Sequence, residues 1–251
     1  MPAVIFFASL DFGKSCYSRT ASYPESERQF CKVIFARTLR SNPLLKPFEN
    51  VGLYCFSPGK FLGDKDPVEM VAAMIRGGAD VIQLREKEMT LRDRLALGFK
   101  LRALTRRENT LFLVNDEIDL ALILDADGVH LGQNDIPVRF ARPLMKDKII
   151  GVSTHSLEQV KDAVESGADY IGVGPVFETT TKEDREEPVG LDLLSKTRDI
   201  CRIPYVAIGG IGMDNIRSIA GAGCKRAAVI SDIMLAPDIE ERCNTLKRLL
   251  L

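Results

Sequence analysis

Short apolar runs alternate with segments of helical spacing from Val51 to the end of the chain. In the run Tyr170–Val173 a β-branched residue stands at every second position. Gly174-Pro175 ends this run, because proline cannot donate to a sheet ladder. The same pattern recurs along the chain. The predicted strands are Val51–Phe56, Val81–Leu84, Leu111–Val114, Gly128–Leu131, Ile149–Val152, Tyr170–Val173, Tyr205–Ile208 and Ala227–Ile230.

A segment of helical spacing follows each of these strands. Before the first such helix, Asp66 occupies the capping position and Pro67 the first helical position, and Gly77-Gly78 stops the helix. Thr90 is a cap for the second helix. The predicted helices are Pro67–Arg76, Leu91–Arg107, Ile118–Leu124, Val138–Leu144, Leu157–Ser166, Leu191–Ile200, Met213–Ala222 and Ile239–Leu250. This α/β alternation predicts a (β/α)8 TIM barrel, with a doubly wound open sheet as the alternative.

Residues 1–48 differ from the rest of the chain, because no period of apolar residues emerges there. We assign them to an N-terminal extension and residues 49–251 to the barrel domain. Within the extension, Val33–Leu39 is predicted as a short helix ended by Asn42-Pro43. A targeting arm or a docking segment is one interpretation. We favour a poorly ordered segment, or translated sequence upstream of the true start.

Composition narrows the class of protein. Of the 251 residues, 45% are hydrophobic and 27% are charged, which is typical of a soluble globular protein. The 34 basic and 35 acidic residues give a net charge of -1, so no overall field favours nucleic acid. No apolar run approaches the ~20 residues of a membrane span, and no basic region precedes the first apolar stretch as in a signal peptide. Six scattered cysteines indicate free thiols in a reducing cytoplasm. Homo-oligomerisation is left open.

A TIM barrel carries its chemistry where the strands end, at the carboxyl face. After the second predicted strand, the period of two places Gln83, Arg85 and Lys87 on one side of the chain. Solvated edge strands show the same alternation, but helices cover the outer face of a barrel strand. The pattern therefore favours a cationic site among the strand ends.

Carboxylates follow the third and fourth predicted strands. Asp116 stands beside Asn115 at the end of the third strand, and Asp135 follows the fourth. Two carboxylates at neighbouring strand ends are suited to Mg²⁺, which prefers a few carboxylates plus phosphate oxygens. Beside Arg85 and Lys87, such an ion suits a diphosphate. Capping of the following helices is an alternative role for either aspartate.

Groups suited to oxyanions follow strands six to eight. Thr179–Lys182 supplies three hydroxyls and an ammonium, although a solvated loop has the same composition. Gly209-Gly210 lets backbone N–H groups approach an anion after the seventh strand. The loops after strands seven and eight form the common phosphate site of TIM barrels. Two subsites for phosphorylated substrates follow, one with a metal and one without.

The two histidines receive no catalytic role. His130 lies inside a strand motif and is interpreted as a structural histidine with a satisfied ring. His155, after the fifth strand, is expected to cap or pack locally.

Six motifs resemble, in the same order, those of the thiamine phosphate synthase family. The resemblance covers about residues 51–250 and implies a TIM-barrel transferase. The motifs are Gln83-Leu84-Arg85-Glu86-Lys87, Asn115-Asp116, Gly128-Val129-His130-Leu131-Gly132-Gln133 with Asp135, Gly151-Val152-Ser153, Gly172-Val173-Gly174-Pro175-Val176-Phe177 with Thr179–Lys182, and Ala207-Ile208-Gly209-Gly210-Ile211.

The resemblance implies a reaction and a set of roles. The family couples 4-amino-2-methyl-5-pyrimidinylmethyl diphosphate to thiazole phosphate and releases diphosphate. Mg²⁺ is the implied cofactor, held by Asp116 and Asp135. The implied diphosphate ligands are Arg85, Lys87, Asn115, Ser153 and Lys182, with Gln83 nearer the pyrimidine. The implied thiazole phosphate ligands are Thr179, Thr181, Gly210, Ile230 and Ser231. The predicted catalytic residues are Arg85, Lys87, Ser153 and Lys182, which stabilise the departing diphosphate so that its C–O bond breaks early.

Several alternatives stay open at this point. A thiazole tautomerase of the same fold would not need the diphosphate subsite. A non-catalytic barrel would bind thiamine intermediates without turnover. A phosphosugar isomerase would use Asp116 and Asp135 as acid and base. The run of three threonines leaves open whether Thr180 binds phosphate, and Glu183–Pro188 is either a lid or only a loop.

Overall fold

The computed structural model of the protein describes residues 48–179 and 187–250. The predicted helix Val33–Leu39 and the loop residues Thr180, Thr181 and Lys182 lie outside the described residues. Within the described residues, no helix has the length and apolar character needed to cross a membrane. Cys55, Cys201, Cys224 and Cys243 are free thiols, as the sequence predicted for them.

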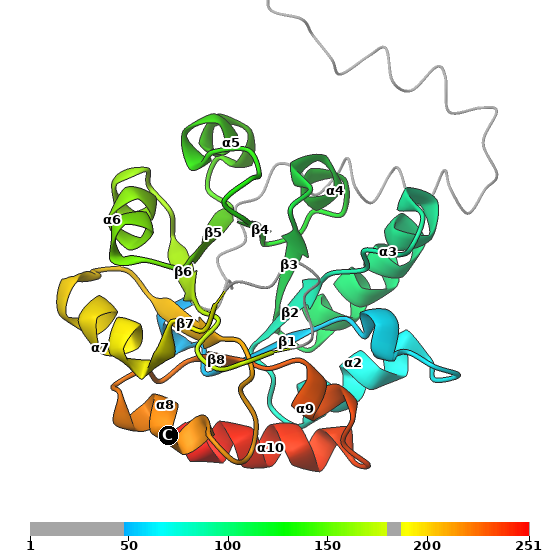
Figure 1. The fold of residues 1–251 in the computed structure, drawn as a ribbon. Coiled ribbons are helices and arrows are strands. Elements are labelled where there is room, and N and C mark those ends of the chain that lie inside the picture. The colour runs from blue at the N-terminus through cyan, green and yellow to red at the C-terminus, as the bar shows by residue number, and fades with distance from the viewer. Residues whose placement is uncertain (1–47, 180–186, 251) are drawn as a thin grey trace, which may run out of the picture. The chain divides into compact units, whose positions relative to one another are not determined.

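Eight parallel strands close into a barrel in sequence order, and β1 pairs with both β2 and β8 (Figure 1). The strands are β1 (Leu53–Phe56), β2 (Val81–Leu84), β3 (Leu111–Asn115), β4 (Gly128–Leu131), β5 (Ile149–Thr154), β6 (Tyr170–Val173), β7 (Tyr205–Ile208) and β8 (Ala227–Ala228). Closure confirms the TIM barrel, and the alternative of an open doubly wound sheet is wrong.

Helices surround the ring of strands (Figure 1). They are η2 (Phe48–Asn50), η3 (Gly59–Phe61), α2 (Pro67–Arg76), α3 (Leu91–Arg107), α4 (Ile118–Ile123), α5 (Val138–Met145), α6 (Leu157–Glu165), α7 (Gly190–Ile200), α8 (Ile216–Gly221), α9 (Ser231–Met234) and α10 (Ile239–Leu250). The predicted caps are confirmed, because the Asp66 carboxylate accepts from the Val68 N–H and the Thr90 hydroxyl accepts from the Asp93 N–H.

Several predicted boundaries shift by one to three residues, and two of the shifts, near the carboxyl face, have a clear cause. The helix predicted from Met213 begins at Ile216, because the Asn215 side chain ties Gly210 and Gly212 into a turn ahead of it. The strand predicted over Ala227–Ile230 is two residues long. The Ile230 carbonyl accepts from the Ile233 and Met234 N–H groups of α9. The chain has therefore left the sheet before this residue.

Three aspartates lock the amino ends of the strands in pairs. Each follows an alanine, comes directly before an even-numbered strand, accepts an N–H from the start of the preceding strand and pairs with a helix cation. The three sets are Asp80 with Leu53 and Lys247, Asp127 with Phe112 and Arg102, and Asp169 with Ile150 and Arg142. The device joins β1 to β2, β3 to β4 and β5 to β6.

Asp127 forms the most enclosed ion pair of the three, because both partners are buried. Its oxygens accept from both terminal nitrogens of Arg102, at 2.9 and 2.8 Å, and from the Phe112 N–H at 2.8 Å. The two side chains are only 7% and 10% exposed. A buried ion pair of this kind leaves a costly uncompensated charge when one partner is removed.

Phe48 closes the barrel interior from the amino end. Its ring is 6% exposed and stacks on Tyr170, with the ring centroids 4.0 Å apart. Phe48 was assigned to the N-terminal extension, but its side chain belongs to the core of the barrel. The assignment of the residues before it remains a prediction.

Asp127→Ala should lower the free energy of unfolding by about 3 to 5 kcal/mol, because it leaves the buried Arg102 guanidinium and the Phe112 N–H without their acceptor. Arg107→Ala is the matched control, since Arg107 forms an exposed pair with Glu108. That pair should contribute no more than about 1 kcal/mol. Chemical denaturation of both variants measures the difference, and equal effects would contradict the assignment.

Phe48→Ala should cost about 3 to 5 kcal/mol of unfolding free energy, because it removes a buried ring and leaves a cavity against Tyr170. Phe140→Ala serves as control, since that ring is 60% exposed. Denaturation midpoints that fall equally in the two variants would show that Phe48 does not belong to the core.

Candidate active site

The carboxyl ends of all eight strands meet at one face of the barrel, because the strands are parallel. Gln83 lies in β2, Asn115 ends β3, Ser153 lies near the end of β5 and Ser231 follows β8. The predicted residues that the structure describes therefore lie at the same end of the barrel. Thr181 and Lys182 cannot be placed, since they lie outside the described residues.

Asp116 and Asp135 form a carboxylate pair at the ends of β3 and β4. Burial, followed by contact with Asp135 and repulsion from it, raises the pKa of Asp116 to about 6. Lys87 and Arg85 attract the carboxylate and lower this pKa, so both cations lie close to Asp116. The structure thus brings together the two acids and two cations that the strand ends predicted.

Neither aspartate caps a helix. The residue before α4 is Glu117, and the residue before α5 is Pro137; neither makes a side-chain capping bond. Asp116 adopts a positive φ of 62°, and its N–H donates to the His130 carbonyl. The Asp135 carboxylate accepts from the Gly132 N–H at 2.6 Å. These bonds hold the pair in place, and the capping alternative is wrong for both residues.

The cationic strand end is held by buried partners. The Arg85 N–H donates to the Ser57 hydroxyl at 2.8 Å. Glu86, only 4% exposed, accepts from the Gly59 N–H at 3.0 Å. Lys87 is exposed. The sequence offered no sign that Glu86 is structural, because its role depends on a loop 27 residues away.

A chain of hydrogen bonds crosses the inside of the barrel. The Gln83 amide donates to the Tyr54 hydroxyl at 2.6 Å, and the Tyr54 and Tyr170 hydroxyls lie 3.1 Å apart. Tyr170 reaches His130 Nδ1 at 2.7 Å, and His130 Nε2 reaches the Ser153 hydroxyl at 2.9 Å. This confirms His130 as a histidine with a satisfied ring.

The two tyrosines were missed by sequence reasoning. Tyr54 and Tyr170 are 2% and 1% exposed, and burial raises the pKa of each phenol above its ordinary value. A buried tyrosine hydroxyl usually has a hydrogen-bond partner, so a tyrosine in an apolar strand was the available signal. His155 donates from Nδ1 to the Gly174 carbonyl after β6, 19 residues away, so its ring has a structural partner at the end of the neighbouring strand.

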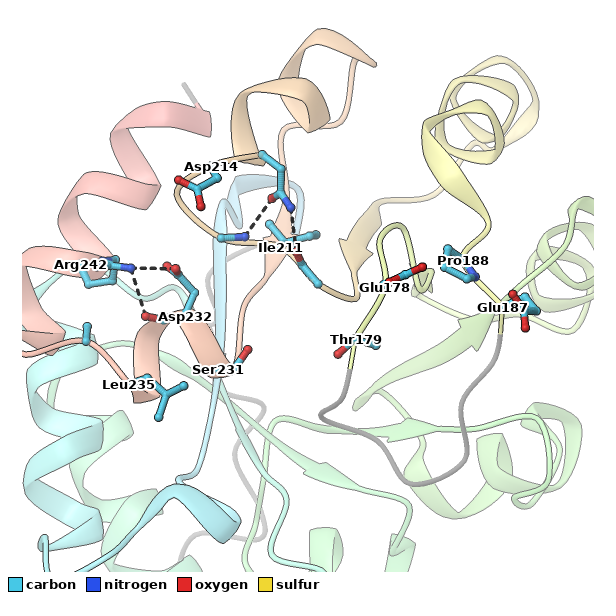
Figure 2. Close-up of a pocket in the computed structure, with 14 residues that line it drawn as sticks. Glu178, Thr179, Glu187, Pro188, Ile211, Asp214, Ser231, Asp232, Leu235 and Arg242 are labelled. Carbon is cyan, nitrogen blue, oxygen red and sulfur yellow. Dashed lines mark hydrogen bonds and ion pairs between the residues drawn. The ribbon is translucent and has the colours of Figure 1, made fainter.

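A pocket of about 840 Å³ opens between the loops after β6, β7 and β8 (Figure 2). Thr179, Gly210 and Ser231 line it, so three of the predicted phosphate ligands share one cavity. Thr179 and Ser231 lie on facing sides of it (Figure 2). Among the described lining residues Arg242 is the one cation, and its guanidinium pairs with Asp232 at 2.7 Å.

Asn215 organises the glycine loop of this pocket. Its amide donates to the Gly210 carbonyl at 2.8 Å and accepts from the Gly212 N–H at 2.9 Å. Gly210 has a φ of 62°, and a Cβ there would lie 2.3 Å from the Glu178 carbonyl oxygen. Only glycine fits this position. Asn215 was missed, because its spacing resembles an ordinary helical residue.

Comparisons with known proteins identify close relatives of the chain. A family model described as thiamine monophosphate synthase matches residues 53–233. The thiamine-phosphate synthase of Caldicellulosiruptor saccharolyticus is 39% identical over 83% of this chain and 95% of its own length. That of Chloroflexus aurantiacus is 46% identical over 72% and 83% of the two chains. A solved structure described as thiamine phosphate pyrophosphorylase from Pyrococcus furiosus is similar to this chain, with a TM-score of 0.73 and 39% identity over 80% and 95% of the chains.

Carboxyl NMR titration of the metal-free protein should place the pKa of Asp116 near 6, and Asp135→Asn should move it back toward 3.8, because it removes the neighbouring charge. Since the raised pKa belongs to the folded state, this group stabilises the fold at low pH. That contribution is lost as the pH rises from 3.8 through about 6.

Asp147→Asn is the control for this titration, because Asp147 is exposed and precedes β5 at the opposite end of the barrel. It should leave the Asp116 titration unchanged. An ordinary pKa for Asp116 in the wild-type protein would show that the two carboxylates do not form a pair.

Proposed function

Because the chain belongs to the thiamine monophosphate synthase family, we propose that it couples 4-amino-2-methyl-5-pyrimidinylmethyl diphosphate to thiazole phosphate. The products are thiamine monophosphate and diphosphate. The chain is a transferase of this family, as relatives 39% to 46% identical over most of its length indicate. The family resemblance read from the sequence is thereby confirmed.

One observation carries the proposal. The carboxyl face holds two chemically different regions: an acid pair with two cations at β2 to β4, and a pocket lined by two hydroxyl side chains and a glycine loop at β6 to β8. Two phosphorylated substrates that differ in charge fit these two regions.

Asp116 and Asp135 fit a divalent cation. Two carboxylates held close enough to raise the pKa of Asp116 provide the negative oxygens that Mg²⁺ prefers. Within the described chain no group of three or more His, Cys, Asp or Glu side chains forms a metal site. This suits an ion completed by substrate oxygens and water. When bound, Mg²⁺ would supply Lewis-acid stabilisation of the diphosphate.

The protein's own groups then act on the leaving group. Arg85 and Lys87 neutralise charge that develops on the diphosphate oxygens, and Asn115 and Ser153 donate hydrogen bonds to them. The family resemblance adds Lys182 to these ligands. Gln83 lies deeper, where the pyrimidine would sit. The C–O bond breaks early, the diphosphate departs and positive charge spreads over the electron-rich pyrimidine. The thiazole nitrogen then forms a C–N bond to the same methylene carbon. No nucleophile or strong base of the protein is required.

The thiazole phosphate is assigned to the pocket of Figure 2. The hydroxyls of Thr179 and Ser231, with the backbone around Gly210 and Ile230, would hold its oxygens, and the family resemblance adds Thr181. Hydroxyls and N–H groups provide this binding, since Arg242 already pairs with Asp232.

A cytoplasmic location also remains part of the proposal.

Purified protein given both phosphorylated substrates and Mg²⁺ should form thiamine monophosphate, followed by mass, and EDTA should abolish the product. Asp116→Ala should lower turnover by about a hundredfold or more without unfolding the protein, because it removes a metal ligand. Asp147→Ala, a change at an exposed position at the opposite end of the barrel, should leave turnover unchanged.

The outcomes separate the alternatives. Product insensitive to EDTA and to Asp116→Ala would overturn the metal assignment. Thiazole isomerisation without coupling would identify a tautomerase, and binding of both substrates without turnover would identify a non-catalytic barrel. Isomerisation of a phosphosugar that depends on both aspartates would favour the isomerase.

A further inference from the structure

We propose that Tyr54, Tyr170 and His130 form a relay of positioning residues that fixes Ser153 as a hydrogen-bond donor to the substrate. The relay is the hydrogen-bonded series Gln83, Tyr54, Tyr170, His130 and Ser153. The inference rests on the proposed function, because it assigns a task to the interior that lies below both substrates.

The first bond of the series has a fixed direction, and the proposed relay continues it along the series. The Gln83 amide nitrogen can only donate, so the Tyr54 oxygen accepts this bond. We assign the Tyr54 hydrogen to the Tyr170 oxygen, 3.1 Å away, because this assignment lets each buried hydroxyl accept one bond and donate one. Tyr170 in turn directs its hydrogen to His130 Nδ1 at 2.7 Å. Each hydroxyl accepts one bond and donates the next, so the direction passes unchanged along the series.

This direction of donation determines which ring nitrogen of His130 carries the hydrogen. Because Nδ1 accepts from Tyr170, the imidazole carries its hydrogen on Nε2, which donates to the Ser153 oxygen at 2.9 Å. Ser153 has one oxygen lone pair engaged in this way, and its own hydrogen is directed elsewhere. An anionic diphosphate oxygen is the matching acceptor. The reverse direction would present a lone pair of Ser153 to the anion and repel it.

The Gln83 end gains a matching specificity. The bond from Nε2 to Tyr54 fixes the orientation of the Gln83 amide, whose carbonyl oxygen is an acceptor and whose second Nε2 hydrogen is a donor. The exocyclic amino group of the proposed pyrimidine is a donor. One series of hydrogen bonds therefore sets an acceptor for the pyrimidine at one end and a donor for the diphosphate at the other.

The barrel is built around this series. The Tyr54 and Tyr170 hydroxyls meet between β1 and β6, two strands that do not pair with each other in the sheet. Gly151 in β5 makes room for the ring, since a Cβ there would lie 2.1 Å from Tyr170 Cζ. Phe48 stacks on the same ring. Buried polar groups that are all satisfied select one arrangement more sharply than apolar packing does.

Histidine NMR on the intact chain tests the relay directly, because the sequence has only two histidines. Long-range ¹H–¹⁵N spectra should show His130 with its hydrogen on Nε2, whereas His155, which donates from Nδ1 to the Gly174 carbonyl, carries it on Nδ1. His155→Gln assigns the signals. Tyr54→Phe should raise the population of the other His130 tautomer, although Tyr54 does not contact His130 within the series.

Tyr205→Phe is the matched control for both tyrosines. Its hydroxyl donates to the Gly223 carbonyl outside the relay, at 3.2 Å. This variant should leave the His130 tautomer unchanged. A wild-type His130 with its hydrogen on Nδ1, or a tautomer unchanged in both Tyr54→Phe and Tyr170→Phe, would overturn the relay.

Kinetics then tests whether the relay acts through Ser153. Tyr170→Phe should lower kcat by about tenfold, the size of one hydrogen bond, and leave KM for thiazole phosphate unchanged. In a Ser153→Ala background the same change should have no further effect. Equal losses in both backgrounds would mean that Tyr170 only supports the fold, and the proposal would fail.

The tautomer measurement tests the relay, and the turnover measurement tests the proposed function, so one can fail without the other. The tautomer is measured without turnover, so the predicted tautomers in a protein that makes no thiamine monophosphate would leave the relay standing and overturn the proposed function. Should Tyr170→Phe not fold, Tyr54→Phe serves for both measurements, because its hydroxyl lies earlier in the same series.

Discussion

The pairing of aspartate carboxylates with strand N–H groups at the amino end of the barrel is the constraint on which the rest of the structure depends. Asp127 accepts three hydrogen bonds, two of them from the Arg102 guanidinium, so its charge is compensated within the protein. At the carboxyl end the logic is opposite, because Asp116 faces Asp135 and burial and repulsion raise the pKa of Asp116. One end of the barrel satisfies its charges for stability, and the other keeps charge available for chemistry.

Between these ends lies an interior that is polar at its centre. A TIM barrel usually fills this space with layers of branched apolar side chains. Here two phenols, an amide and an imidazole take part of it, at the cost of removing polar groups from water. Such a core is stable only when every group is bonded, so its geometry is narrowly defined. A narrowly defined interior suits the proposed site, which would orient two substrates.

The sequence predicted most strands and helices because apolar spacing and caps are local signals, as at Asp66 and Thr90. It also predicted that Asp116 and Asp135 meet, because parallel strands end at one face. It missed what long-range side-chain bonds determine: Asn215 delays the start of α8, and Tyr54 reaches Tyr170 across 116 residues. No period along the chain encodes such a contact.

Charge distributes the two proposed substrates between the two regions. A diphosphate carries more negative charge than a monophosphate and gains more from Arg85, Lys87 and a divalent cation. The pocket at β6 to β8 is lined by Glu178, Glu187, Asp214 and Asp232 as well as Arg242, so its described charges disfavour a polyanion. Hydroxyls and oriented N–H groups bind a monophosphate through hydrogen-bond geometry, with less dependence on net charge. If each anion binds in its proposed region, the reacting carbon and nitrogen would meet in a single orientation.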